Sequence, residues 1–265
     1  MPTITSSDGV RLNYADEGAG APVVLIAGFC APLESWELQR AALAAAGFRV
    51  IGFDRRSHGA SESPPYGQRL SRHGRDLQEL LSALELEDVT LIGGSMGAST
   101  VWAYYDLFGA ERLSRIVTVD QTPRMVNDGD WTHGFYGLTR QNVGTFFDNG
   151  IPETGRGRQG DRLTGVQRVA EALGRMPVFA DPRTPERRVL LQNHAEQDWR
   201  DVIARVEVPS LFLAGRESQL WPAEHAEAAA ATNKLATVVT LDDCGHAANL
   251  DQPERTNEAI LEFLR

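Results

Sequence analysis

The chain has 265 residues, 42% of them hydrophobic, which is enough for one domain with a sizeable core. Its formal net charge of −10 argues against nucleic acids and anionic membranes as partners, because phosphate groups are bound by basic surfaces. The N-terminus lacks a basic segment followed by an apolar stretch, and no run reaches the roughly 18 apolar residues of a membrane span. We therefore expect a cytoplasmic protein without membrane contact.

The opening residues 3–18 predict an antiparallel hairpin, because an Asp-Gly pair separates two extended stretches. Short apolar runs then alternate with long helical patterns, as expected for a parallel sheet covered on both faces. The helical patterns lie at 33–48, 69–86 and 99–110. The apolar runs lie at 22–28, 48–54, 88–94, 115–120, 209–215 and 236–242.

The alternation stops between residues 123 and 200, where no strong strand pattern occurs. We interpret this segment as a helical cap inserted after the sixth strand of a single domain, residues 1–265. Such a cap would lie over the carboxyl ends of the strands, where α/β sheets bind their ligands. Its aromatic residues Trp131, Phe135 and Tyr136 are expected to form the apolar roof of a substrate pocket.

The strongest local motif is GGSMG, residues 93–97, between the apolar run 88–94 and the helical pattern that follows. G-x-S-x-G in this context is the nucleophile elbow, a sharp strand-to-helix turn that presents a serine above the sheet. Ser95 is therefore the candidate nucleophile. The alternative is a serine that only caps the helix.

A serine hydroxyl needs a general base within hydrogen-bond reach. His246, in DDCGHAANLDQPE after the last strand pattern, occupies the place that the chain order Ser, acid, His gives the base. His58, in DRRSHGASE, is the main competitor, but it precedes the elbow.

Two backbone N–H groups are needed to stabilise the oxyanion of an acyl-transfer reaction. The N–H of Met96, which follows the nucleophile, and that of Phe29, in the loop after LIAG, are the candidates. Phe29 and Cys30, in the same loop, are also expected to contact the substrate. The two cysteines, Cys30 and Cys244, are too few for a disulfide framework and lack zinc-site spacing, so we expect free thiols and no metal.

Four motifs, AGFCAPLESW, GFDRRSHGASE, GGSMGAST and CGHAANLDQPE, together resemble the α/β-hydrolase superfamily, and within it haloperoxidase-like and enol-lactonase-like serine esterases. The resemblance implies an eight-stranded, mostly parallel sheet with helices on both faces and a lid after the sixth strand. It also implies a Ser–acid–His triad with no metal or organic cofactor. Where the family usually has His-Gly before the oxyanion loop, this chain has Ala27-Gly28, so a side chain that often braces the loop is missing.

The triad acid departs from the family pattern. In the frame that the family sets between Gly215 and Pro222, the acid position holds Ser218, which cannot compensate an imidazolium as a carboxylate does. Asp120, at the end of the sixth strand pattern, is the favoured replacement, because some relatives, such as haloalkane dehalogenases, carry their acid there. Glu217, one residue out of frame, and Asp243, close to His246 in sequence, remain alternatives.

These features predict a serine hydrolase that cleaves a carboxylic ester or lactone of a small apolar or aromatic molecule through an acyl-enzyme. Perhydrolase (cofactor-free haloperoxidase) activity and C–C bond hydrolysis remain alternatives on the same triad, and a non-catalytic ligand-binding protein is another. Epoxide hydrolase and dehalogenase chemistry are disfavoured, because those relatives have an aspartate where this chain has Ser95. Arg124, near the expected pocket edge, is a candidate for binding a substrate carboxylate. The sequence carries no signal for the oligomeric state.

Overall fold

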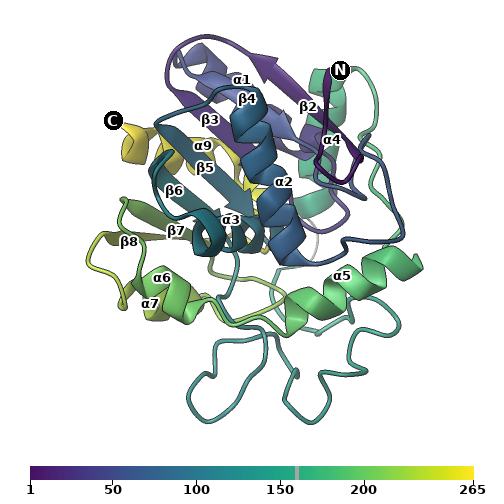
Figure 1. The fold of residues 1–265 in the computed structure, drawn as a ribbon. Helices are drawn as coiled ribbons and strands as arrows, with labels where there is room; N and C mark the ends of the chain where they lie inside the picture. The colour runs from purple at the N-terminus through teal and green to yellow at the C-terminus, as the bar shows by residue number, and fades with distance from the viewer. Residues whose placement is uncertain (159–160) are drawn as a thin grey trace.

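The computed structural model describes residues 1–158 and 161–265 (Figure 1). In this part of the chain, eight strands form one sheet with the order β1-β2-β4-β3-β5-β6-β7-β8. The first two strands are antiparallel to their neighbours, and β3 to β8 run parallel to one another. The expected mostly parallel, eight-stranded sheet and the opening hairpin are thus confirmed. The strands are β1 Thr3–Thr5, β2 Arg11–Glu17, β3 Pro22–Ile26, β4 Arg49–Phe53, β5 Val89–Gly94, β6 Leu113–Val119, β7 Ser210–Gly215 and β8 Ala236–Leu241.

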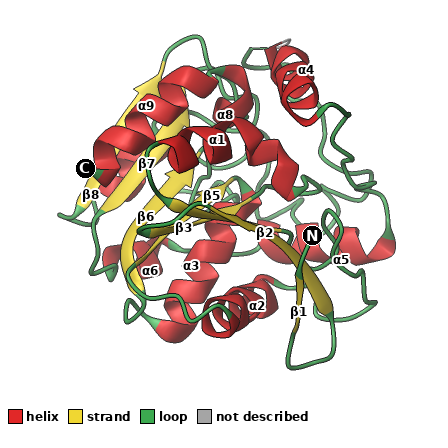
Figure 2. Cartoon of the chain, turned by 90° about the horizontal axis from the view of Figure 1, so that it is seen from above, coloured by secondary structure: helices red, strands yellow, loops and turns green. Residues whose placement is uncertain are grey.

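Helices cover both faces of this sheet, as Figure 2 shows from above. On one face, α1 (Glu37–Ala45) packs against α9 (Pro253–Leu264), next to the short helix α8 (Ala248–Asp251). On the other face, α2 (Leu70–Ala83) packs against α3 (Met96–Phe108). Each face buries its own hydrophobic cluster, which explains why the central strands are apolar along their whole length.

Three short helices complete the main domain at its edges. They are the 3₁₀ helix Leu33–Trp36 after β3, α6 (Arg200–Ala204) before β7, and α7 (His225–Ala230) between β7 and β8. Because β3, β5, β6, β7 and β8 are parallel, the loops that leave them gather at one edge of the sheet, which is where functional groups of α/β folds meet.

The segment between β6 and β7 differs from the helical cap that we expected. Its second half contains α4 (Asp161–Leu173) and α5 (Pro185–Ala195), but residues 120–158 form turns with isolated β-bridges. The physical reason lies in the aromatic residues of the first half. Phe135 and Phe147 are fully buried in the main core, so this stretch is held by long-range packing and needs no helical periodicity.

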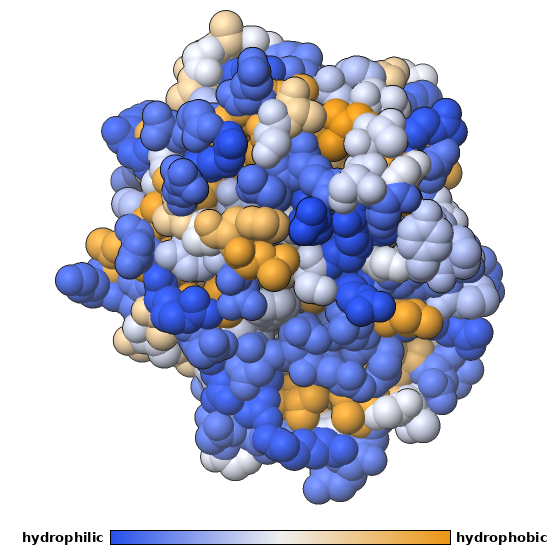
Figure 3. Space-filling view, in the orientation of Figure 1, coloured by the Kyte–Doolittle hydropathy of each residue, from blue (hydrophilic) through white to orange (hydrophobic). Residues whose placement is uncertain are grey.

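The surface in Figure 3 is largely hydrophilic, with apolar residues scattered among polar ones. Within the described ranges, no helix is long and apolar enough to cross a membrane.

Candidate active site

The candidate nucleophile Ser95 lies between β5 and α3 with φ 50° and ψ −128°, a conformation that residues with a side chain seldom adopt. The glycines of the motif make this turn sterically feasible. A Cβ at Gly97 would lie 2.1 Å from the carbonyl oxygen of Ile26, and a Cβ at Gly93 would lie 2.5 Å from the nitrogen of Ala98. The turn therefore needs glycine on both sides of Ser95, as the nucleophile elbow requires.

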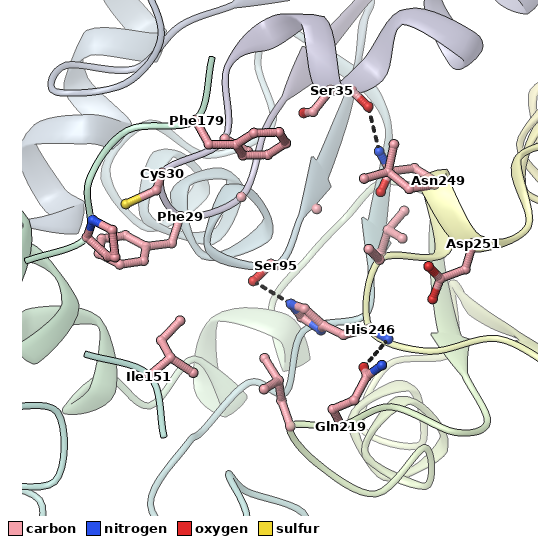
Figure 4. Close-up of a pocket in the computed structure, with 18 of the residues that line it drawn as sticks. Phe29, Cys30, Ser35, Ser95, Ile151, Phe179, Gln219, His246, Asn249 and Asp251 are labelled. Carbon is pink, nitrogen blue, oxygen red and sulfur yellow. Dashed lines mark hydrogen bonds between the residues drawn. The ribbon is translucent and has the colours of Figure 1, made fainter. Parts of the chain in front are cut away.

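The structure brings three predicted residues into one hydrogen-bonded chain. The Ser95 Oγ lies 3.0 Å from His246 Nε2 (Figure 4), and His246 Nδ1 lies 2.7 Å from Asp120 Oδ2. A proton on Nδ1 is donated to the carboxylate, which leaves Nε2 free to accept the serine proton. The residues come from three separate loops, after β5, β6 and β8.

Asp120 is fully buried and surrounded by donors. The Ser218 hydroxyl donates to Oδ2 at 2.7 Å, and the Gly215 N–H donates to Oδ1 at 3.1 Å. A second imidazole, that of His225, lies 3.5 Å from Oδ1. Burial alone would raise the pKa of Asp120, but hydrogen bonds and charge from His225 and His246 lower it to about 2. The carboxylate is thus ionised at neutral pH.

The alternative acids lie elsewhere. The bonds of Glu217 in the described structure are made by its backbone, whose N–H donates to Cys244 and whose carbonyl accepts from Arg158. Asp243 is exposed and pairs with Arg158 at 3.3 Å. In the described structure neither carboxylate bonds to His246, whereas Asp120 bonds directly to it.

His58, the competing base, is also placed away from the serine. It is fully buried and its Nδ1 donates to the backbone carbonyl of Arg56 at 2.8 Å. Burial, followed by the charge of Arg55, lowers its pKa well below the usual histidine value. These contacts indicate a structural role for His58 and not that of the general base.

The two candidate oxyanion donors lie beside the serine. The loop backbone passes so close that a Cβ at Gly28 would lie 3.2 Å from the Cβ of Ser95. Within the described part of the chain, the N–H groups of Phe29 and Met96 have no hydrogen-bond partner. They are thus available to an oxyanion formed at Ser95.

A cavity of about 510 Å³ opens above Ser95 and His246. Figure 4 shows that its two walls differ in chemistry. One wall is mainly apolar and includes Phe29, Cys30, Ile151 and Phe179. The opposite wall carries the polar side chains of Ser35, Gln219, Asn249 and Asp251.

We expected Trp131, Phe135 and Tyr136 to line this cavity, but that prediction was wrong. The Trp131 indole is buried and donates to the carbonyl of Arg124 at 2.9 Å, and Phe135 packs edge-on against Trp221 in the core. Tyr136 lies under the guanidinium of Arg156. All three aromatic side chains pack within the segment after β6 or against the core. The apolar side chains that this segment contributes to the cavity include Ile151 and Phe179.

Arg124 is not placed to bind a substrate carboxylate. Its guanidinium pairs with Asp128 and with Asp130, the latter at 2.8 Å, and it lies 3.6 Å from Asp198. Three carboxylates therefore already surround it, and it is not part of the cavity lining.

The two cysteines are both free and buried. Burial raises the pKa of the Cys30 thiol to about 11, and it raises that of Cys244 well above the usual range. Neither is a thiolate at neutral pH, so neither has the reactivity of a cysteine nucleophile. Among the residues that the structure describes, no cluster of side chains has the composition of a metal site.

Two residues that contact His246 were not predicted from the sequence. The ring of Trp221 packs edge-on against His246, with centroids 5.0 Å apart, and the Gln219 side chain accepts from the His246 N–H at 2.8 Å. Both residues lie in the loop after β7, next to the displaced acid position. The regular spacing of Gly215 and Pro222 indicated that this loop reaches the site, but not which side chains would face the imidazole.

A family model described as the alpha/beta hydrolase fold matches residues 21–253. The chain belongs to the α/β-hydrolase family. It is accordingly an enzyme of the hydrolase class, and the fold implied by the four sequence motifs is confirmed.

Individual relatives of this α/β hydrolase include two kinds of enzyme. A non-heme haloperoxidase from Rhodococcus erythropolis is 26% identical over all of this chain and 99% of its own length. The bromoperoxidase from Bacillus anthracis is 28% identical, with a TM-score of 0.83 over 99% of both chains. A thermophilic esterase from Thermogutta terrifontis is 26% identical, with a TM-score of 0.78 over 100% of this chain and 97% of its own.

Proposed function

We propose that the protein is a serine hydrolase that cleaves a carboxylic ester or lactone of a small apolar or aromatic molecule. The observation that carries this proposal is the continuous hydrogen-bonded chain from Ser95 through His246 to the ionised Asp120. Serine, imidazole and carboxylate in this order are the groups that acyl transfer needs.

The reaction follows from this geometry. The Ser95 Oγ attacks the acyl carbon while His246 Nε2 takes its proton, and Asp120 compensates the imidazolium that forms. The N–H groups of Phe29 and Met96 hold the developing oxyanion. The imidazolium then protonates the leaving alcohol, and a water molecule, activated in the same way, hydrolyses the acyl-enzyme.

The substrate class is inferred from the cavity. A volume of about 510 Å³ is within the range of pockets for small molecules. We assign the acyl group to the wall formed by Phe29, Cys30, Ile151 and Phe179, because an apolar group gains most by leaving water there.

Perhydrolysis is the second candidate function, and the haloperoxidase names of the relatives favour it. Hydrogen peroxide in place of water would attack the acyl-enzyme and give a peracid, without any change in the triad. Peracid release from an ester in the presence of hydrogen peroxide, compared with hydrolysis of the same ester, measures the balance between the two reactions.

The decisive test is covalent labelling of the serine. A fluorophosphonate probe should label the wild type and not Ser95→Ala, and the wild type should hydrolyse p-nitrophenyl butyrate. A wild type that is folded yet takes no label would contradict the enzymatic role and favour a ligand-binding protein on the same fold.

A further inference from the structure

Arg55, two residues after β4, is buried to 1% exposure, and the charge of the neighbouring Asp54 favours its charged form without forming an ion pair with it. Within the described residues, no carboxylate lies within ion-pair distance of its guanidinium. The neighbouring Arg56 is different, because it is bound by Asp76 at 2.6 Å and by Asp8 at 3.1 Å. A buried cation without an ion pair is costly, so the contacts that its guanidinium does make must offset that cost.

The guanidinium of Arg55 is held by neutral acceptors. Its Nη2 donates to the backbone carbonyls of Ala27 at 3.1 Å and Gly28 at 2.9 Å. The same group lies 3.0 Å from His58 Nε2, and Nη1 lies 3.2 Å from His73 Nδ1. The acceptor role of His58 is fixed by its other nitrogen, because Nδ1 donates to a backbone carbonyl.

The protonation states agree with this arrangement. Burial, and then the charge of Arg55, lowers the pKa of both His58 and His73 well below the usual histidine value, so both imidazoles are neutral acceptors at neutral pH. Burial also lowers the pKa of Arg55, but only to about 9, so the guanidinium keeps its charge.

The Gly28 carbonyl accepts from Arg55 at 2.9 Å and from the backbone N–H of Ala31 at 3.3 Å, and these two contacts together set the orientation of one peptide plane. The structure has no cis peptide bond in its described part, so the Gly28 carbonyl and the Phe29 N–H point in opposite directions. When Arg55 binds the carbonyl on one side, the N–H of Phe29 is turned to the other side. Gly28 and Phe29 line the cavity beside Ser95, and that N–H has no partner in the described structure.

We propose that Arg55 is the positioning residue of the oxyanion hole: it binds the Gly28 and Ala27 carbonyls and thereby aims the Phe29 N–H at the oxyanion. Ala27 has no polar side chain with which to brace the loop itself. The positive charge also polarises the Gly28–Phe29 amide, which makes its N–H a stronger donor. This inference rests on the proposed acyl-transfer function, because it assigns a donor to the oxyanion of that reaction.

The test compares transition-state binding with substrate binding in Arg55→Met and Arg55→Lys. Methionine removes the charge and all donors, and lysine keeps the charge but loses the planar fork that reaches several acceptors at once. The readouts are kcat and KM for p-nitrophenyl butyrate, and the inhibition constant of propyl trifluoromethyl ketone, which forms an oxyanion with the active serine. Near-ultraviolet circular dichroism checks that each variant is folded.

We expect Arg55→Met to lose about 10- to 100-fold in kcat and in affinity for the ketone, with a much smaller change in KM, because removing one oxyanion donor outright costs 10²–10³. The kcat and the ketone affinity of Arg55→Lys should lie between those of Arg55→Met and the wild type. The lysine variant also carries the test if the methionine variant does not fold.

Arg56→Lys is the matched control, since it makes the same change at an equally buried arginine whose partners are Asp8 and Asp76. It should lose stability but keep the kcat and ketone affinity of the wild type. A folded Arg55 variant that keeps the ketone affinity within about twofold of an active wild type would overturn the inference and leave the proposed function intact. A wild type that neither hydrolyses the ester nor binds the ketone would remove the proposed function, and this inference with it.

Discussion

At the level of single residues, the most unusual feature of the site is the position of its carboxylate, which follows β6 and not β7. At the usual acid position, Ser218 donates a hydrogen bond to Asp120 Oδ2, the same oxygen that His246 Nδ1 contacts. Asp120 itself has φ 43°, a strained conformation for a residue with a side chain. The buried donors around the carboxylate compensate this strain and hold the carboxylate toward the imidazole.

We predict that Asp120→Asn lowers kcat on p-nitrophenyl butyrate by about four orders of magnitude, by analogy with triad aspartates of serine proteases. An amide cannot compensate the imidazolium, and its NH₂ group would favour the wrong histidine tautomer. Glu217→Gln is the matched control and should retain activity, because in the described structure it is Asp120, and not the Glu217 side chain, that bonds to His246. The opposite pattern would assign the triad acid to Glu217.

The double variant Asp120→Asn/Ser218→Asp extends this prediction. The Ser218 Oγ lies 2.7 Å from the oxygen that binds His246, so a carboxylate at position 218 should reach the same imidazole nitrogen. Its kcat should exceed that of Asp120→Asn by at least about tenfold. No recovery would mean that the two strand ends are not interchangeable as sources of the acid.

At the scale of elements, the close packing of α2 on α3 depends on Gly74. A Cβ at this position would lie 2.7 Å from the backbone nitrogen of Tyr104, and backbone atoms within a packed helix cannot move aside easily. We predict that Gly74→Ala destabilises the protein by about 1–2 kcal/mol, because overpacking of about 1–3 kcal/mol outweighs a gain of up to about 1 kcal/mol in helix propensity.

Urea unfolding of Gly74→Ala and the wild type measures this difference. Gly129→Ala is a suitable control, because a Cβ there meets no atom within 4 Å and its φ is not in the left-handed region. Its stability should stay within about 0.5 kcal/mol of the wild type. If Gly74→Ala proves more stable than the wild type, the two helices separate more easily than their close approach indicates.

The elements that could be predicted from the sequence are those determined by residues close together in the chain. The strands follow from short apolar runs, and the elbow follows from two glycines that the turn needs on either side of Ser95. The three residues of the candidate triad could be predicted because each lies at or shortly after the end of a predicted strand, and the ends of neighbouring parallel strands meet. The course of residues 120–158 could not be predicted, because Phe135 and Phe147 are placed by the main core, and a ring that Phe135 contacts, Trp221, is distant in sequence. The same applies to Arg55, because its partners at residues 27, 28 and 73 lie in other segments of the chain.

At the scale of the whole molecule, the protein encloses several histidines that are neutral when folded. Burial lowers the pKa of His58 and His73 well below the usual value, and it lowers that of His194 to about 3. In the unfolded chain these groups titrate near 6.5. Below pH 6.5 the unfolded chain therefore binds protons that the folded protein does not bind.

This difference fixes the direction of the pH dependence. Stability should be greatest above about pH 6.5 and fall as the pH is lowered from there, with each buried histidine contributing up to about 1.4 kcal/mol per pH unit. Asp120 adds to the loss only below its unfolded pKa of 3.8, since its folded pKa is lowered to about 2. The histidine effect is thus separable in the window from pH 7.5 to 5.5, measured by urea unfolding.

We predict that His194→Gln reduces this slope by up to about 1.4 kcal/mol per pH unit, because one of the buried titrating groups is removed. At pH 7.5 the histidine is neutral in both states, so the difference between variant and wild type there reports packing alone and serves as the internal control. The gap between the two proteins should then change in favour of the variant as the pH falls to 5.5. A wild-type stability that stays constant over this window would show that these histidines take up protons as readily in the folded protein as in the unfolded chain.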